Sequence, residues 1–103
     1  MNQQDYLTEF KHITEAMYKL TEAKNHDYAS DGNAFRNFQM VEHFGVLTTE
    51  QGIFTRMTDK MSRLAGYLAK GELKVNDEKI TDTLEDLAVY AIILNIYLNN
   101  KKK

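Results

Sequence analysis

The sequence predicts an all-α protein, a compact four-helix domain with a bundle-like arrangement. Two observations support this prediction. The chain contains no proline, and apolar residues recur at steps of three and four along four segments, the spacing of amphipathic helices. Four of the five glycines lie at or near breaks in this period, as expected of turns between helices; they are Gly32, Gly45, Gly52 and Gly71.

The helices are expected in this order. A first helix over about residues 3–24 is followed by a polar loop, KNHDYASDGN, and by a short second helix over about residues 34–43. Thr48 or Thr49 is suited to cap a third helix that runs to about Lys70, since threonine hydroxyls accept hydrogen bonds from the first turn. After the linker GELKVN, Asn76 is the expected cap of a fourth helix.

Size and composition limit the classes of function. A chain of 103 residues is expected to form one domain, residues 1–103, small enough that a second copy would add useful burial. Its 43% apolar and 27% charged residues are typical of soluble globular proteins. The longest uncharged run is too short for a membrane span, and the N-terminus lacks a signal-peptide pattern, so we expect a cytoplasmic location without membrane association.

Two absences narrow the chemistry further. Because the sequence has no cysteine, disulfides, thiol nucleophiles and zinc–thiolate sites are excluded. The formal net charge of −2 provides no overall electrostatic footprint for nucleic acid, so direct DNA binding is not expected.

Two lines of side chains run along the fourth helix. The apolar line is its expected core face: Ile80, Leu84, Leu87, Ala91, Leu94 and Leu98. The second line is acidic in its first half and apolar in its second: Asp82, Asp86, Tyr90, Ile93 and Tyr97. A line that ends in large apolar side chains is not expected to be wholly exposed. We therefore expect Asp82 and Asp86 to point towards another element or another subunit.

The third helix carries a cationic edge beside its apolar side. Arg56, Lys60 and Arg63 follow one another at helical spacing, with Asp59 next to them. One interpretation is purely structural, with interhelical salt bridges between these cations and the acids of the fourth helix. The other is a ligand site, because a half-buried cluster of six charges is costly and packing alone would need fewer.

Several segments together resemble a known family. The patterns K-x-x-D-Y, N-F, D-K-x-x-R and D-E-x-x-x-D-x-x-x-D-x-x-x-Y occur in KNHDYAS, NAFRNF, GVLTTEQGIFTRMTDKMSRL and DEKITDTLEDLAVYAIIL. With this joint spacing, residues 22–98 resemble the nucleotide-modification-associated domain of the first type, a small helical family of phages and prophages. The resemblance implies a role in nucleotide or modified-base metabolism and, for a phage-encoded protein, a place in the host cytoplasm.

A looser likeness is to the MazG-type all-alpha nucleoside triphosphate pyrophosphatases. Those enzymes hold magnesium with E-x-x-E on one helix and E-x-x-D on the next, because carboxylates one turn apart can share a hard cation. This chain departs from that pattern. Its third helix offers only Asp59, and Asp82 and Asp86 are four residues apart instead of three. One Mg²⁺ on Asp82 and Asp86 is the metal site that these residues would still allow.

The predicted polar loop and the second helix contribute further candidates. As a lid over a nucleotide, Tyr28 would stack on a base and Lys24 or His26 would meet phosphate. As a structural feature, Asp27 would brace a turn and Tyr28 would cover a helix end. Asn37, in NAFRNF, is a candidate for reading a base edge or a ribose.

The sequence therefore predicts a protein that binds a nucleotide or nucleotide-derived molecule. Arg56, Lys60 and Arg63 would hold phosphate, and Tyr90 would complete the wall of the site. The acids would either orient these cations or hold Mg²⁺: Asp59, Asp82 and Asp86. Three alternatives are a magnesium-dependent nucleoside triphosphate pyrophosphatase, a non-catalytic sponge that sequesters a host nucleotide signal, and a protein-binding inhibitor. A homo-oligomer is expected, because Tyr90, Ile93 and Tyr97 form a second apolar line on the fourth helix.

Overall fold

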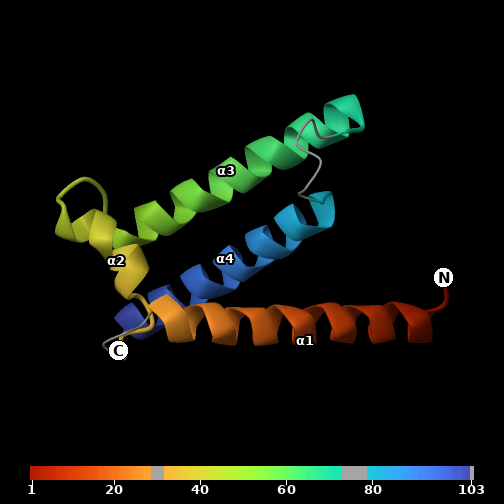
Figure 1. The fold of residues 1–103 in the computed structure, drawn as a ribbon, viewed down its shortest axis with the longest axis horizontal. Helices are drawn as coiled ribbons and strands as arrows, with labels where there is room; N and C mark the ends of the chain where they lie inside the picture. The colour runs from red at the N-terminus through yellow and green to blue at the C-terminus, as the bar shows by residue number, and fades with distance from the viewer. Residues whose placement is uncertain (29–31, 73–78, 103) are drawn as a thin grey trace. The chain divides into compact units, whose positions relative to one another are not determined.

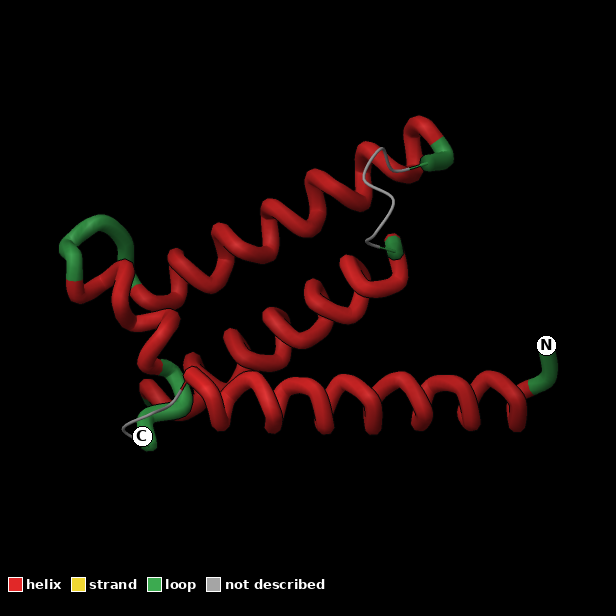
Figure 2. Tube along the Cα trace, viewed as in Figure 1, coloured by secondary structure: helices red, strands yellow, loops and turns green. Residues whose placement is uncertain are grey.

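A computed structural model describes residues 1–28, 32–72 and 79–102. Within these ranges the chain forms four α-helices and no β-strand (Figures 1 and 2): α1 (Gln3–Tyr28), α2 (Arg36–His43), α3 (Thr49–Lys70) and α4 (Ile80–Lys101). The all-α class and the four predicted helices are therefore confirmed. No helix in this part of the chain is both long and apolar enough to cross a membrane.

The helices fall into two compact units, residues 1–34 and residues 35–103. The first unit contains α1, and the second contains α2, α3 and α4, which pack on one another as in a helical bundle. The single domain over residues 1–103 that the sequence predicts stays a prediction.

The first unit is a long helix whose C-terminal end is hydrogen-bonded to the segment that follows it. At its start, Asn2 Oδ1 accepts a hydrogen bond from the backbone N–H of Asp5 at 2.8 Å, as an N-cap does. α1 continues to Tyr28, so its last turn contains residues that the sequence predicted to form a loop. That prediction was wrong because Asn, His and Asp lower helix propensity only modestly. Past the helix, Ala34 O accepts a hydrogen bond from Asn25 Nδ2 at 2.9 Å.

A rigid turn joins α2 to α3. Gly45 has a φ of 77°, the left-handed conformation that favours glycine after a helix. The N–H of Val46 donates to the carbonyl of Val41 at 3.2 Å and closes the turn. α3 then starts with a capping box, in which Gln51 N–H donates to Thr48 Oγ1 at 3.2 Å and Thr48 N–H donates to Gln51 Oε1 at 3.0 Å. Of the two predicted caps, Thr48 is the one used.

The two long helices of the second unit run antiparallel (Figure 1). Glu50, at the start of α3, contacts Lys101 at the end of α4, and Lys60 contacts Asp86 further along. The predicted cap of the fourth helix, Asn76, lies outside the described residues. Among the described residues of the second unit, four side chains are buried, two apolar and two polar: Phe38, Ile53, Thr49 and Thr83.

The predicted core face of the fourth helix requires a correction. Leu84 is 44% exposed and Leu98 is 41% exposed, although both belong to the apolar line that was expected to be buried. The line that begins with Asp86 faces α2 and α3 instead, because the Tyr97 ring packs on Phe35 with centroids 5.2 Å apart and the Tyr90 ring packs on Phe38. Since α4 is apolar on most sides, its periodicity could not show which face packs.

Candidate functional site

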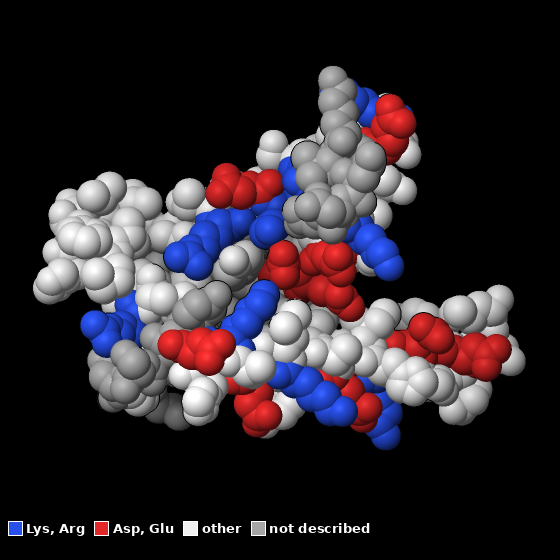
Figure 3. All heavy atoms as spheres, in the orientation of Figure 1, with Lys and Arg blue, Asp and Glu red and all other residues white. Residues whose placement is uncertain are grey.

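An ion pair links the cationic edge of α3 to α4. Lys60 Nζ lies 3.1 Å from Asp86 Oδ2, and the two side chains are 25% and 32% exposed. Arg63 is half-buried on the same edge and also interacts with neighbouring groups. The structural interpretation of these charges is thus supported for the pair of Lys60 and Asp86. Figure 3 shows Lys and Arg side chains gathered over α3, with carboxylates beside them.

Arg56 has a different environment. Its guanidinium carbon lies 4.9 Å from the centre of the Phe38 ring, which is a cation–π contact between α3 and α2. The Phe38 ring in turn meets the Tyr90 ring edge-on, with centroids 6.4 Å apart and planes at 89°. Arg56, Phe38 and Tyr90 therefore form a continuous row of side-chain contacts that connects α3, α2 and α4. Phe38 is 8% exposed, whereas Arg56 is exposed.

The three predicted metal ligands have separate surroundings. Asp86 pairs with Lys60, and Asp82 Oδ2 accepts a 3.4 Å hydrogen bond from the backbone N–H of Lys79, at the start of its own helix. Asp59 is exposed on α3. In the described ranges no group of three or more His, Asp or Glu side chains is placed to hold a metal ion. Mg²⁺ binding by Asp82 and Asp86 stays a prediction.

The candidates from the predicted polar loop and from the second helix are placed as follows. Lys24, His26 and Asp27 are exposed on the last turns of α1, and His26 Nδ1 lies 3.8 Å from Asp27 Oδ1. The side chain of Tyr28 lies outside the description. These four residues belong to the first unit, whereas Asn37 is half-buried on α2 in the second. Their roles as a lid and as a base reader stay predictions.

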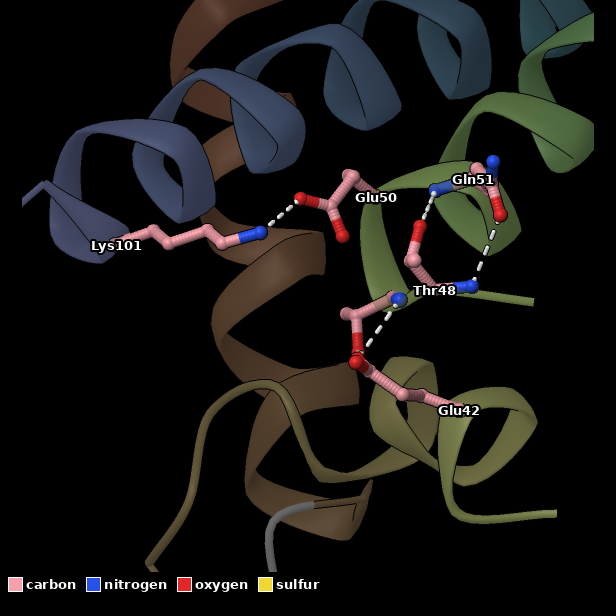
Figure 4. Close-up of polar contacts among 6 residues, drawn as sticks. Glu42, Thr48, Glu50, Gln51 and Lys101 are labelled. Atoms are coloured by element: carbon pink, nitrogen blue, oxygen red, sulfur yellow. Dashed lines mark hydrogen bonds and ion pairs between the residues drawn. The ribbon is translucent and has the colours of Figure 1, made fainter. Parts of the chain in front are cut away.

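A polar cluster that sequence analysis missed joins the ends of three helices (Figure 4). Glu42 Oε2 accepts two hydrogen bonds from Thr49, from Oγ1 at 2.6 Å and from the backbone N–H at 3.0 Å. Lys101 Nζ donates to Glu50 Oε2 at 2.6 Å. Helical periodicity cannot reveal these contacts, because one crosses a turn and the other joins residues that are 51 positions apart in the sequence.

The same contacts shift the pKa values of their charged members. The hydrogen bonds from the hydroxyl and then the backbone of Thr49 lower the pKa of the Glu42 carboxyl. The hydrogen bond from Lys101 lowers the pKa of Glu50, and the same bond raises the pKa of Lys101. The cluster therefore favours its charged forms, and it fixes the end of α4 against the start of α3.

Comparison with known proteins gives no family for this chain. No protein-family model, curated protein or solved structure matches it. The resemblance to the nucleotide-modification-associated domain therefore stays an expectation from sequence, and a function has to be argued from the site.

Proposed function

We propose that the chain binds the phosphate group of a nucleotide, or of a nucleotide-derived molecule, along the edge of α3. The observation that carries this proposal is the exposed Arg56 guanidinium, held 4.9 Å from the centre of the Phe38 ring. A guanidinium against a ring face keeps its N–H donors at its rim, and two of them can bind two oxygens of one phosphate. Lys60 adds a second cation one turn further along α3, but this cation already forms an ion pair with Asp86.

The nucleotide part of the proposal rests on the resemblance described above. It points to nucleotide or modified-base metabolism in a phage-related setting, with the host cytoplasm as the location. Tyr90 would contribute from α4 through the ring of Phe38, against which it packs. The candidates Arg63 and Asn37 lie in the same unit.

Binding without hydrolysis agrees best with the surroundings of the acids. Asp86 already accepts from Lys60, and Asp82 accepts from the N–H of Lys79. A magnesium-dependent pyrophosphatase would need both carboxylates directed at one metal ion, whereas each of them here accepts from a different donor. Sequestration of a nucleotide signal needs no metal. In a protein-binding inhibitor, by contrast, the charges would be interface contacts and nucleotides would have no effect.

The test is a panel of nucleoside phosphates, added with and without Mg²⁺, with the unfolding temperature and phosphate release both measured. A ligand that binds the folded state at about one hundred times its Kd stabilises it by about 2.7 kcal/mol. Arg56→Ala should weaken binding about tenfold to hundredfold, the value of a charge-assisted contact. Lys70→Ala, which removes an exposed cation from the last turn of the same helix, is the matched control.

The outcomes separate the candidates. Stabilisation that Arg56→Ala removes and Lys70→Ala keeps, without turnover, supports binding. Magnesium-dependent phosphate release that is lost in the Asp82→Asn, Asp86→Asn double variant would establish the pyrophosphatase instead. If no nucleotide raises the unfolding temperature of the parent protein, the proposal is wrong.

We also propose that the chain associates with a second copy of itself. The rings first expected to drive association pack on α2 of the same chain, so other side chains would have to form the contact. Three large apolar side chains of α4 are exposed by 44 to 53%: Leu84, Ile92 and Ile96. Exposed apolar side chains grouped on one helix are typical of an interaction surface.

A further inference from the structure

Phe38 is the residue against which the Arg56 guanidinium rests. Phe38 lies on α2, and the centre of its ring is 4.9 Å from the guanidinium carbon of Arg56. Phe38 is 8% exposed, so a ligand on the surface reaches Arg56 and not the ring. Any influence of Phe38 on a ligand must therefore pass through Arg56.

The ring of Phe38 packs against α4, and the helix that carries Phe38 packs closely against α3. Tyr90 of α4 packs edge-on against the ring with centroids 6.4 Å apart. The helices α2 and α3 approach closely at Gly52, where an added Cβ would lie 2.6 Å from Val41 Cγ1 and 3.9 Å from the carbonyl oxygen of Phe38. Because Gly52 lies four residues before Arg56, this close approach and the Arg56 side chain share one face of α3.

A packed ring beneath a guanidinium has a definite effect on anion binding. The negative face of the ring attracts the cation and limits the rotamers of a long, flexible side chain. An arginine has five N–H donors, more than one ring face can accept, so donors stay available to an anion. Binding then costs less conformational entropy than it would for a freely moving arginine.

We propose that Phe38 is a positioning residue that pre-orients Arg56 for a phosphate group with at least two non-bridging oxygens, such as the terminal group of a di- or triphosphate. The inference rests on the proposed function and adds to it the residue that orients the cation and the geometry of the group that it binds. It also predicts that Arg56→Lys does not substitute, because an ammonium group lacks the planar fork that two oxygens require.

The experiment varies the charge distribution of the ring while keeping its shape. Phe38 is replaced by 3,4,5-trifluorophenylalanine, which has a similar outline and a much weaker negative face, and separately by leucine. Calorimetry then measures the binding of inorganic tripolyphosphate to the full chain. We expect both changes to weaken binding about threefold to thirtyfold, the range of a cation–π contact. The trifluoro variant should keep the unfolding temperature nearly unchanged.

The control places the same fluorinated residue at Phe44, which is 71% exposed after α2, where binding should stay as in the parent protein. If Phe38→Leu fails to fold, the trifluoro variant alone decides. Parent-like binding by the trifluoro variant would show that Phe38 is only a core residue, while the proposed function would stand. If the parent chain itself fails to bind tripolyphosphate, the inference falls, and the proposed function falls with it if no nucleotide raises the unfolding temperature either.

Discussion

Two fully buried threonines show how one hydrogen bond determines whether a buried hydroxyl stabilises or destabilises the fold. Thr49 and Thr83 both have no exposed surface. The Thr49 hydroxyl donates to Glu42 at 2.6 Å, whereas Thr83 Oγ1 has no hydrogen-bond partner among the described residues. A buried polar group that makes no hydrogen bond costs free energy, and one that makes a good bond to a charged group does not.

We therefore predict opposite effects for the same substitution at the two positions. Thr83→Val keeps the shape of the side chain and removes the unpaired hydroxyl, so it should raise the free energy of unfolding by about 1 kcal/mol. Thr49→Val removes a donor from the Glu42 carboxylate and should lower stability. Urea unfolding of the two variants beside the parent protein measures both. Equal losses at both sites would show that Thr83 has a partner after all.

The acids of the polar cluster make stability depend on pH. Because the pKa values of Glu42 and Glu50 are lowered from their ordinary value of 4.5, the folded state binds fewer protons than the unfolded state in acid. Their contribution is complete above about pH 4.5 and is lost as the pH falls through the lower values of the folded state. Lys101 acts in the opposite range, since its pKa is raised from 10.5 and its contribution is lost only as the pH rises above that value.

Glu50→Gln should remove part of this acid dependence. We expect the urea midpoint of the parent protein to fall more steeply below pH 4.5 than that of the variant, while the two curves run parallel at neutral pH. Glu22→Gln, an exchange of an exposed carboxylate on α1, serves as the control. Identical acid slopes for parent and Glu50→Gln would mean that the bond to Lys101 contributes no stability in solution.

At the scale of the elements, the approach of α2 to α3 depends on one glycine. A Cβ at Gly52 would lie 2.6 Å from Val41 Cγ1, and the stiff, branched valine side chain cannot easily move away. Gly66, on the same helix, has no neighbour within 4 Å of such an atom among the described residues. Close packing therefore requires a glycine at position 52 but not at position 66 of the same helix.

Alanine substitutions at Gly66 and Gly52 should therefore have opposite effects on stability. Gly66→Ala should stabilise the protein by about 0.5 to 1 kcal/mol, because alanine favours a helix more than glycine does. Gly52→Ala should gain the same propensity but lose more through the clash with Val41, so its net effect should be destabilising. Chemical unfolding compares the two directly. A stabilising Gly52→Ala would contradict the close packing of the two helices.

The helices were predictable where local chemistry determines them. Thr48 and Gln51 form the cap of α3 as their types suggest, and Gly71 ends the helix with a φ of 77°. The packed face of α4 was not predictable, because large apolar residues lie on several of its sides. In the candidate site, periodicity allowed salt bridges between the cations of α3 and the acids of α4 as one of two interpretations, and Lys60 does pair with Asp86. The contact of Arg56 with Phe38 did not follow from periodicity, since it joins two helices whose separation is set by Gly52.

At the scale of the whole molecule, the exposed apolar side chains of α4 are the surface for which we propose a partner. Leu84, Ile92 and Ile96 carry no charge and are about half exposed, and a second copy is the partner that we propose for them. Burying large apolar side chains in an interface contributes in proportion to the area removed from water.

Light scattering over a range of micromolar concentrations tests this association. The parent protein should show a mass above 12.0 kDa that rises with concentration, and the Ile92→Ser, Ile96→Ser double variant should move towards the single-chain mass. Phe44→Ser, which changes an exposed apolar residue on α2's C-terminal side, is the control. A single-chain mass for the parent protein at every concentration would contradict the proposed oligomer.

The central claim, that phosphate binds at Arg56 on α3, is tested most directly by nuclear magnetic resonance of the labelled full chain during a titration with tripolyphosphate. We predict that the side-chain Nε signal of Arg56 and the backbone amides around Lys60 shift progressively and saturate. Sodium chloride at the same ionic strength should not reproduce these shifts, since it screens exposed charges without forming bidentate contacts. Saturating shifts confined to other parts of the chain, or none beyond those of the salt control, would contradict the account.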